Sequence, residues 1–502
     1  MPTRVKIDPI TRIEGHMAIE AVIDGGVVKD AKSAGTLFRG FEIILQGRDP
    51  RDANRLTQRI CGVCPTAHAI ASALCLDDAF GVGDKIPDNA KLIRALVSGS
   101  DFLQSHILHF YHLAALDYVD AVSVLGDLYP FVPRYEGDYR ISGQANADLV
   151  NHYIRALDIR RKCHEMLSIF GGKMPHDVGI VPGGVTEKPT EDKITNFLWR
   201  LNEIRDFIDN AYIPDVLIVA KSYGDYFGIG KGCRKFLSYG GFDVPTGKLF
   251  KTGLVCPDLS ARRAADLQLE PFAMENITED VKHSWYADSC SGKKPAEGET
   301  KPDLTKKQAY SFLKSPRYDG KVCEVGPLAR TLINYVHADT KTRRLVDGLL
   351  GQVGTGIDAL FSVLGRHAAR ALEAKLIADA MVDCLLVLKP DEPVIVDSEI
   401  PEKGEGAGLT EAPRGSVGHW ISIKDKKIDR YQVITPTAWN ASPKDDKDQP
   451  GAVEQAIIGT KVKDKDNPFE LVRIVRAFDP CLACSVHLLD AKRSELGVFR
   501  VV

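Results

Sequence analysis

The spacing of apolar residues changes along the chain from a strand-like start to helical periods over most of the remaining length. An apolar run at 17–24 meets a second run at 27–28 through two glycines, a pattern typical of a β-hairpin. Helical periods then cover about 53–80 and 89–122. We therefore expect β structure at the N-terminus, followed by long helices.

Helical periods return at about 147–170 and 191–211, and at about 343–388 as one helix or a helix pair. The segment 282–321 is rich in Lys, Pro, Gly and Ser, which predicts a long surface excursion rather than part of the core. Apolar runs within 420–434 flank a Lys-Asp-Lys-Lys turn and predict a second hairpin. The predicted fold class is α+β, predominantly helical, with long central helices and small peripheral β hairpins or sheets.

Composition is typical of a globular protein and gives no sign of a nucleic-acid-binding or membrane-spanning protein. The 502 residues exceed the usual single-domain length, with 44% apolar and 26% charged residues. A formal net charge of −3 gives no argument for nucleic acid or an anionic membrane surface as a partner. No window approaches the roughly 18 apolar residues of a membrane span, and the N-terminus lacks an apolar signal core. We expect no direct membrane span, and the compartment stays open: cytoplasmic, or membrane-associated or exported together with a partner.

Two Cys-x-x-Cys pairs carry the candidate chemistry, one at Cys61 and Cys64 and the other at Cys481 and Cys484. The other seven of the eleven cysteines stand alone, which does not make a disulfide scaffold. Two thiolates at this spacing can hold one metal, and two such pairs make a four-thiolate site. The pairs lie 417 positions apart, from 64 to 481, so the site can close only when the fold closes. This predicts a metal buried at the centre of the protein.

Two other interpretations of the pairs are less favoured. A structural zinc ribbon also uses two pairs, but only about 15–20 residues separate them. A thioredoxin-like redox site needs one pair in a βαβ setting and would leave the second pair unexplained.

The residues around the two pairs resemble the two signature motifs of the large subunit of [NiFe] hydrogenases. Further motifs of that family stand in the expected order, so that the match extends from residue 7 to residue 487. The matching segments are Arg12–His16, Phe38–Glu42, Arg59–His68, His109–Leu113, Glu411–Gly415, Pro436–Asn440 and Asp479–His487. The resemblance implies the fold of that subunit, with long helices that bury the metal site.

The resemblance also implies a nickel–iron centre, Ni–Fe(CO)(CN)₂. Cys61 and Cys481 would be terminal nickel ligands, and Cys64 and Cys484 would bridge nickel to iron. Soft thiolates suit both metals. The family splits H₂ heterolytically, which requires a base beside nickel, and Cys481 is the matching thiolate. The implied function is reversible oxidation of H₂ to protons and electrons, with uptake as the expected direction.

Four further residues correspond to groups around this centre. Glu14 corresponds to the carboxylate that relays the proton outward. Arg414 corresponds to a guanidinium poised over the active site, which can donate a hydrogen bond to one cyanide. Thr437 corresponds to the hydroxyl at the other cyanide, and His68 to a histidine that donates to a bridging sulfur.

Glu42, His487 and the backbone carbonyl of Val433 correspond to a Mg²⁺ site near the metal pair. Oxygen ligands suit Mg²⁺, whereas an imidazole is less usual there, so His487 depends on the resemblance. Pro413 and Asp479 correspond to neighbours of the Ni–Fe pocket.

The chain departs from many relatives at Ser105, where they have an aspartate that hydrogen-bonds the active-site arginine. Serine cannot form an ion pair with Arg414, so Asp479 remains its obvious carboxylate partner. We interpret Ser105 as a branch difference rather than a sign of inactivity, because all four cysteines are kept.

Fifteen residues follow His487. In the family a maturation endopeptidase removes such a tail after nickel-insertion factors have loaded the metal, so we expect 488–502 to be a processed extension. An ordinary terminal strand is the alternative. The catalytic region would then be 1–487, with a β part at about 1–50, a helical core at about 51–390, and a C-terminal β part with the metal-ligand arm at about 391–487.

No Fe–S cluster ligands are evident beyond the four paired cysteines, so we expect electrons to enter a separate small subunit that carries such clusters. A non-catalytic complex I-like subunit would lack the nickel ligands, whereas all four are present here. An H₂-sensing regulatory hydrogenase would generally lack the tail. The glycine-rich stretch 351–356 lies within a helical pattern without a preceding strand and does not predict a nucleotide site.

Overall fold

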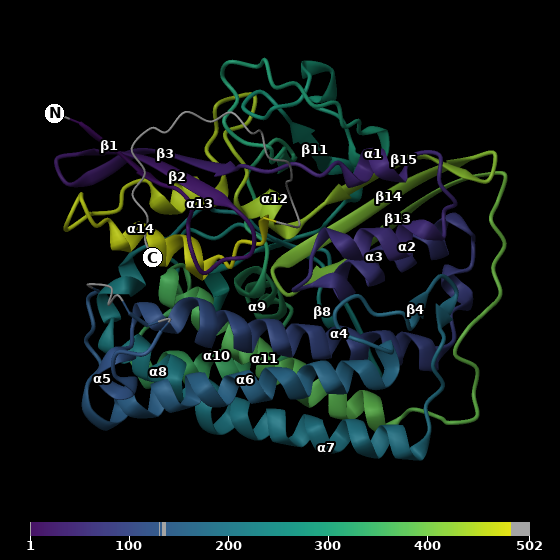
Figure 1. Ribbon diagram of the computed structural model, residues 1–502, viewed down its shortest axis with the longest axis horizontal. Coiled ribbons are helices and arrows are strands. Elements are labelled where there is room, and N and C mark those ends of the chain that lie inside the picture. Colours follow the sequence, from purple (N-terminus) through teal and green to yellow (C-terminus); the bar gives the residue numbers. More distant parts are fainter. Residues whose placement is uncertain (1, 130, 133–136, 483–502) are drawn as a thin grey trace.

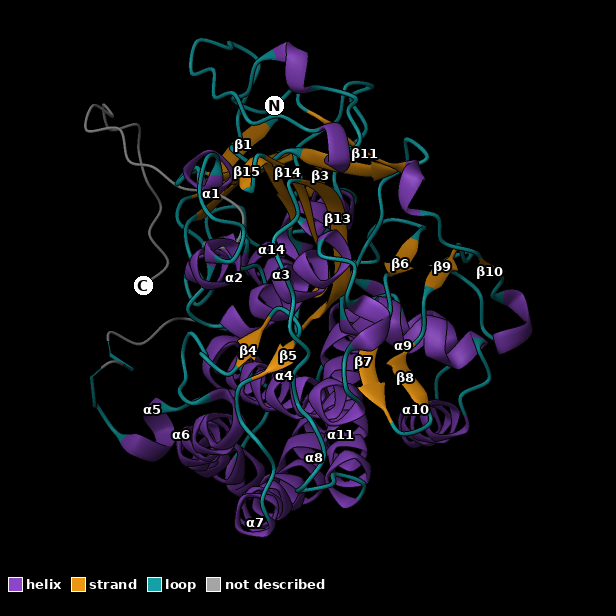
Figure 2. Cartoon of the chain, turned by 90° about the vertical axis from the view of Figure 1, so that its right-hand side faces the viewer, coloured by secondary structure: helices purple, strands orange, loops and turns teal. Residues whose placement is uncertain are grey.

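Long helices form one layer of the molecule, and small antiparallel sheets lie above them (Figures 1 and 2). The computed structural model describes residues 2–129, 131–132 and 137–482. Within these residues the predicted α+β class, predominantly helical, is confirmed.

Four long helices build the helical layer in the lower half of Figure 1. They are α4 (Asp88–Leu108), α6 (Gly143–Gly171), α7 (Glu191–Phe207) and α11 (Val363–Leu386). α4 and α11 are buried along nearly their whole length. Since α4 packs against both α6 and α11 and also contacts α3 (Pro65–Ala79), it connects the helical layer with the segment that follows the first cysteine pair.

Two three-stranded antiparallel sheets lie above the helices. The N-terminal sheet has the order β1 (Thr3–Ile7), β2 (Met17–Asp24), β3 (Val27–Gly35), and Asp24 pairs with Val27 at the predicted hairpin. The C-terminal sheet has the order β13 (Lys403–Ala412), β14 (Gly415–Lys424), β15 (Lys427–Ile434). Both predicted hairpins are therefore confirmed, and each gains a third strand.

The remaining α-helices are α1 (Phe41–Leu45), α2 (Asp52–Thr57), α5 (Val122–Leu125), α8 (Ile213–Ser222), α9 (Pro327–Val336), α10 (Thr340–Val353), α12 (Pro436–Asn440), α13 (Ala452–Ile457) and α14 (Phe469–Ala477). The remaining strands are β4 (Ile180–Val181), β5 (Gly184–Val185), β6 (Phe236–Ser238), β7 (Gly241–Val244), β8 (Gly247–Phe250), β9 (Gly253–Val255), β10 (Leu269–Glu270), β11 (Ile277–Asp280) and β12 (Ser315–Tyr318). The helix pair expected at 343–388 is confirmed as α10 and α11.

Two predicted helices are interrupted. The helix expected at 53–80 breaks at residues 61–64, because a 3₁₀ turn ends at Ile60 and α3 begins only at Pro65. The helix expected at 89–122 remains regular to Leu108 and then widens into a π-helical turn over His109–Ala114. Both interruptions overlap the sequence motifs. The second is a π-helical turn, a feature that often occurs at functional sites.

The segment 282–321 is only partly the surface excursion that its composition predicts. Its outer part is exposed, but Tyr286, Leu313 and Lys314 are buried, and β12 at its end pairs with β11. The prediction was wrong for this inner part, because charged residues there are buried in ion pairs instead of facing solvent. Arg317, for example, pairs with Asp445 at 2.8 Å.

Alternating glycines in β13 allow α3 to lie directly on the strand. A Cβ at Gly406 would stand 2.3 Å from the carbonyl oxygen of Cys75, and one at Gly408 would stand 2.0 Å from that of Ala71. Side chains at these two positions would push α3 away from β13. The glycines therefore set the distance between this strand and the helix that follows the first cysteine pair.

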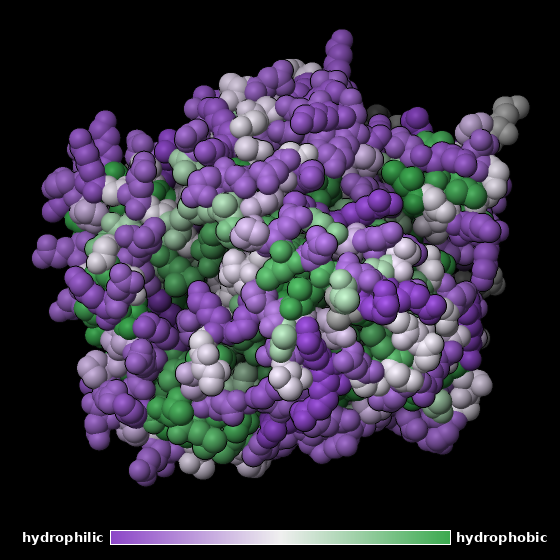
Figure 3. Space-filling model, turned by 180° about the vertical axis from the view of Figure 1, so that it is seen from behind, coloured by the Kyte–Doolittle hydropathy of each residue, from purple (hydrophilic) through white to green (hydrophobic). Residues whose placement is uncertain are grey.

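The face turned away from the viewer in Figure 1 is mainly polar, with separate apolar patches (Figure 3). No helix in the described part of the chain is both long and apolar enough to cross a membrane.

Candidate metal centre

The first cysteine pair lies in the loop that interrupts the predicted helix. Cys64 caps α3, and Pro65 takes the first helical position, where its missing N–H costs no hydrogen bond. The N–H groups of Val63 and Cys64 both donate to Cys61 Sγ at 3.3 Å. The loop is therefore wrapped around the Cys61 sulfur, and both cysteines are buried.

Cys481 reaches the same place from the other end of the chain, just after α14. Its sulfur lies 3.2 Å from that of Cys61, and the sulfurs of Cys61, Cys64 and Cys481 all lie within 4.8 Å of one another. Sulfur atoms about 2.3 Å from one metal lie at most about 4.6 Å apart, close to the 4.8 Å within which these sulfurs lie, and thiolates are soft donors. The group therefore fits a shared thiophilic metal. Cys484 and His487 lie outside the described residues.

A backbone bridge between Glu14 and Cys481 holds the two chain ends together. The N–H of Glu14 donates to the carbonyl of Pro480 at 3.4 Å, and the N–H of Leu482 donates to the carbonyl of Glu14 at 2.7 Å. The side chain of Glu14 then lies with Oε2 3.1 Å from Cys481 Sγ. Glu14 is only half-buried, whereas Cys481 is fully buried.

Arg414 stands at the turn between β13 and β14 and is buried. Its Nη2 donates to Asp479 Oδ1 at 2.9 Å, and its Nη1 donates to Ser105 Oγ at 3.2 Å. Burial lowers the pKa of Arg414, but the negative charges of Asp479 and of the cysteine sulfurs outweigh it and raise that pKa well above its ordinary value. The guanidinium thus remains a permanent cation beside the sulfurs.

Thr437 and His68 are both buried, and each makes a polar contact of its own. The Thr437 hydroxyl accepts a hydrogen bond from the N–H of Cys481 at 3.0 Å and so fixes the backbone of that cysteine. His68 Nδ1 lies 3.1 Å from Nε2 of His419. The other ring nitrogen of His419, Nδ1, lies 2.8 Å from the Tyr431 hydroxyl. Burial lowers the pKa of His68 to about 4, so the ring is neutral near neutral pH.

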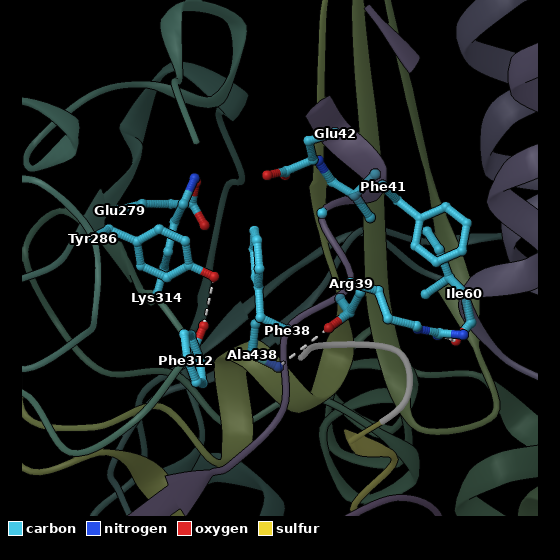
Figure 4. Close-up of a pocket in the computed structure, with 13 residues that line it drawn as sticks. Phe38, Arg39, Phe41, Glu42, Ile60, Glu279, Tyr286, Phe312, Lys314 and Ala438 are labelled. Carbon is cyan, nitrogen blue, oxygen red and sulfur yellow. Dashed lines mark hydrogen bonds and ion pairs between the residues drawn. The ribbon is translucent and has the colours of Figure 1, made fainter. Parts of the chain in front are cut away.

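Glu42 lines a cavity (Figure 4), and Phe41, Ile60 and Val433 of its lining pack with the three buried cysteines. One carboxylate oxygen accepts from the N–H of Val433 at 2.9 Å, and the other accepts from the Thr300 hydroxyl. Glu279 and the buried Lys314, 3.3 Å apart, lie across the cavity from Glu42 (Figure 4). Oxygen donors therefore gather at this cavity, as a hard cation requires.

Sequence reasoning missed the groups that surround these residues. The carbonyl of Pro413 accepts from Arg330 at 3.1 Å, and Arg330 also pairs with Glu373 and Glu411. Glu411 was visible within a family motif, but Arg330 and Glu373 lie in helices where burial of a charge leaves no sequence pattern.

A model of the nickel-dependent hydrogenase family matches residues 39–128 and 125–487. The chain belongs to this family. A further model, described as HoxL-like, matches residues 4–34. Among curated relatives of this hydrogenase chain, the large subunit of the periplasmic [NiFeSe] hydrogenase of Desulfomicrobium baculatum is 44% identical, covering 99% of this chain and 97% of that protein. The large chain of the quinone-reactive Ni/Fe-hydrogenase of Wolinella succinogenes is 34% identical, covering 100% and 98%.

Solved structures agree with the sequence comparison. The reduced Ni-Fe-Se hydrogenase of D. vulgaris Hildenborough matches with a TM-score of 0.88 and 44% identity, covering 97% of this chain and 100% of that one. H₂-activated [NiFeSe]-hydrogenase of Dm. baculatum matches with a TM-score of 0.89 and 43% identity, covering 97% and 100%. The chain is therefore a hydrogenase large subunit, an oxidoreductase that acts on H₂, with the fold that the motifs implied. The names of the relatives from Dm. baculatum and D. vulgaris include selenium, whereas this chain has cysteine at all four motif positions.

Proposed function

We propose that this chain is the catalytic large subunit of a [NiFe] hydrogenase that works mainly in H₂ uptake. The observation that carries the proposal is the buried cluster of three sulfurs with the Glu14 carboxylate 3.1 Å from one of them. Relatives named uptake hydrogenase large subunits, at 35% and 36% identity, support the direction.

The cluster fits a Ni–Fe centre, which would be held by Cys61, Cys64 and Cys481 together with Cys484. When bound, such a centre supplies the site at which H₂ is split. In this proposal one CO and two cyanides would also bind the iron. By resemblance, Arg414 and Thr437 would donate hydrogen bonds to the two cyanides.

The chain's own residues handle the proton. By resemblance, the Cys481 sulfur would take it as the base, and Glu14, whose Oε2 lies 3.1 Å from this sulfur, would accept it. Glu14 then passes the proton outward, because its carboxylate is the half-buried end of the pair. Arg414 stays protonated and holds its charge near the sulfurs without competing for the proton.

Glu42, the Val433 carbonyl and His487 would hold Mg²⁺ in the cavity of Figure 4. The Glu42 carboxylate already lies against the backbone of Val433, which supports the two oxygen ligands. His487 lies outside the described residues, so this ligand depends on the family resemblance.

A small subunit with Fe–S clusters is the proposed partner. Within the described residues, Cys61, Cys64 and Cys481 are the one group of three or more metal-capable side chains close enough to share an ion, so we propose that electrons need another carrier. We also propose that an endopeptidase removes 488–502 after nickel insertion. Intact mass of the active enzyme tests this step, and retention of these residues would contradict it.

The decisive experiment is metal analysis and infrared spectroscopy on the enzyme purified with its small subunit, together with H₂-dependent dye reduction. We expect nickel and iron in the enzyme, CO and cyanide stretches, and dye reduction under H₂. Absence of nickel and of these stretches from the active enzyme would overturn the assignment.

A further inference from the structure

Arg330 on α9 uses every donor of its guanidinium in one buried network. Nε and Nη2 donate to the two oxygens of Glu373 at 2.7 and 2.6 Å. Nη1 donates to Glu411 at 2.6 Å and to the carbonyl of Ala412 at 2.9 Å. Nη2 also donates to the carbonyl of Pro413 at 3.1 Å. Five hydrogen bonds therefore join α9 to α11 and to the end of β13.

Three of these bonds reach the residues that immediately precede Arg414. Glu411, Ala412 and Pro413 form the last part of β13 and the start of the turn that presents Arg414. The carboxylate of Glu411 and the backbone carbonyls of Ala412 and Pro413 are held by a side chain that is itself only 1% exposed. The position of the Arg414 Cα thus depends on Arg330.

The same network reaches the other contact of Arg414. Glu373 Oε1 also lies 2.8 Å from Nε2 of His106 on α4. His106 directly follows Ser105, whose hydroxyl accepts from Arg414 at 3.2 Å. Arg330 and Glu373 therefore connect both the strand that carries Arg414 and the helix that carries its hydroxyl partner.

We propose that Arg330 is a positioning residue for Arg414, and that it sets where the Arg414 guanidinium lies relative to the cysteine sulfurs. This inference rests on the proposed function, in which Arg414 faces the metal centre. Among the described residues, Arg330 contacts neither the sulfurs of Cys61, Cys64 and Cys481 nor Asp479, so its effect passes through residues 411–413 and through α4.

The physical reason lies in the shape of the guanidinium. Its planar fork can serve two carboxylates and two carbonyls at once, whereas a lysine ammonium has three donors on a single point charge. Arg330→Lys therefore keeps the positive charge between Glu373 and Glu411 but removes some of the hydrogen bonds that hold residues 411–413. Displacement of about 1 Å at a catalytic group can cost about 100-fold in rate.

The test compares Arg330→Lys with Arg317→Lys in the complete enzyme. Arg317 is a matched control, because it is equally buried, pairs with Asp445 and donates to backbone carbonyls, but does not contact 411–414. For Arg330→Lys we expect a normal nickel content and shifted cyanide stretches in the infrared spectrum. We also expect kcat to fall at least about tenfold, with little change in KM for H₂. For Arg317→Lys we expect wild-type spectra and kcat, with a lower unfolding temperature.

Equal kcat and equal infrared spectra for the two variants at equal nickel content would overturn the inference. If Arg330→Lys does not take up nickel, Glu373→Gln provides the second test, since it removes one charge partner while keeping the side-chain shape. A wild-type spectrum and rate in Glu373→Gln would also overturn the inference. Failure of the proposed function itself is distinguishable, because the wild-type enzyme would then lack nickel and H₂ oxidation.

Discussion

The Cys481 sulfur lies 3.1 Å from the Glu14 carboxylate, although 467 positions separate the two residues. The backbone bridge between them holds this distance from both sides. Both chain ends are thus needed to bring this sulfur and this carboxylate together, and the first prediction follows from the pair.

Glu14→Gln should remove the proton acceptor while leaving a side chain of the same size. We expect H₂ oxidation to fall by about 100-fold or more, because a positioned acid or base contributes about 10²–10⁴ in rate. Nickel content should stay normal. Dye-coupled H₂ oxidation measures the rate, and Glu20→Gln on β2 is the control for loss of a nearby carboxylate. Full activity of Glu14→Gln would exclude Glu14 from the proton route.

Ser105→Asp should introduce the carboxylate that the family resemblance implies at this position. Arg414 would then face two carboxylates instead of Asp479 and a hydroxyl, which changes the hydrogen bond without removing the cation. We expect a modest change in activity or oxygen response, less than about tenfold in rate. Ser105→Ala is the matched variant that only deletes the hydroxyl. Complete loss of metal in Ser105→Asp would contradict the interpretation of Ser105 as a branch difference.

Gly408→Ala should destabilise the contact between β13 and α3. The added Cβ would stand 2.0 Å from the carbonyl oxygen of Ala71, so the helix must move. We expect a loss of about 1–3 kcal/mol in the free energy of unfolding, measured by denaturant or thermal unfolding. Gly348→Ala is the control, because Gly348 lies exposed in α10 with nothing near its Cβ position. There we expect a gain of up to about 1 kcal/mol.

Glu454 should make stability depend on pH. Its buried carboxylate accepts from the N–H groups of Ser33 and Gly451, both at 2.9 Å, and from the Tyr310 hydroxyl at 2.8 Å. Burial raises the pKa of Glu454 from 4.5 to about 7. Because the folded state then binds more protons than the unfolded state, the free energy of unfolding should fall as pH rises from about 4.5 to about 7, by about 3 kcal/mol.

Unfolding temperatures at about pH 5 and about pH 8 measure this dependence. Glu454→Gln should flatten it, whereas Glu405→Gln on the exposed part of β13 should leave it unchanged. An unaltered pH dependence in Glu454→Gln would assign the effect to another group.

The hairpins and long helices could be predicted because local patterns determine them. Glycine turns and the 3.6-residue period act over a few residues, whatever the rest of the chain does. The break at 61–64 and the buried strand Ser315–Tyr318 could not be predicted in this way. In both places partners distant in sequence decide whether a helix continues or a charge is buried.

The sequence by itself determined the type of chemistry. The two cysteine pairs specify soft ligands, and the motifs around them identify the family and its candidate residues. Tertiary structure alone decided the geometry. It brings the Cys481 sulfur to Glu14 and places Ser105 and Asp479 on the guanidinium of Arg414. It also places Arg330 against the turn that precedes Arg414. The reason is physical, since a buried ion pair or hydrogen bond depends on which distant segments exclude water around it, and no local pattern of residues records that.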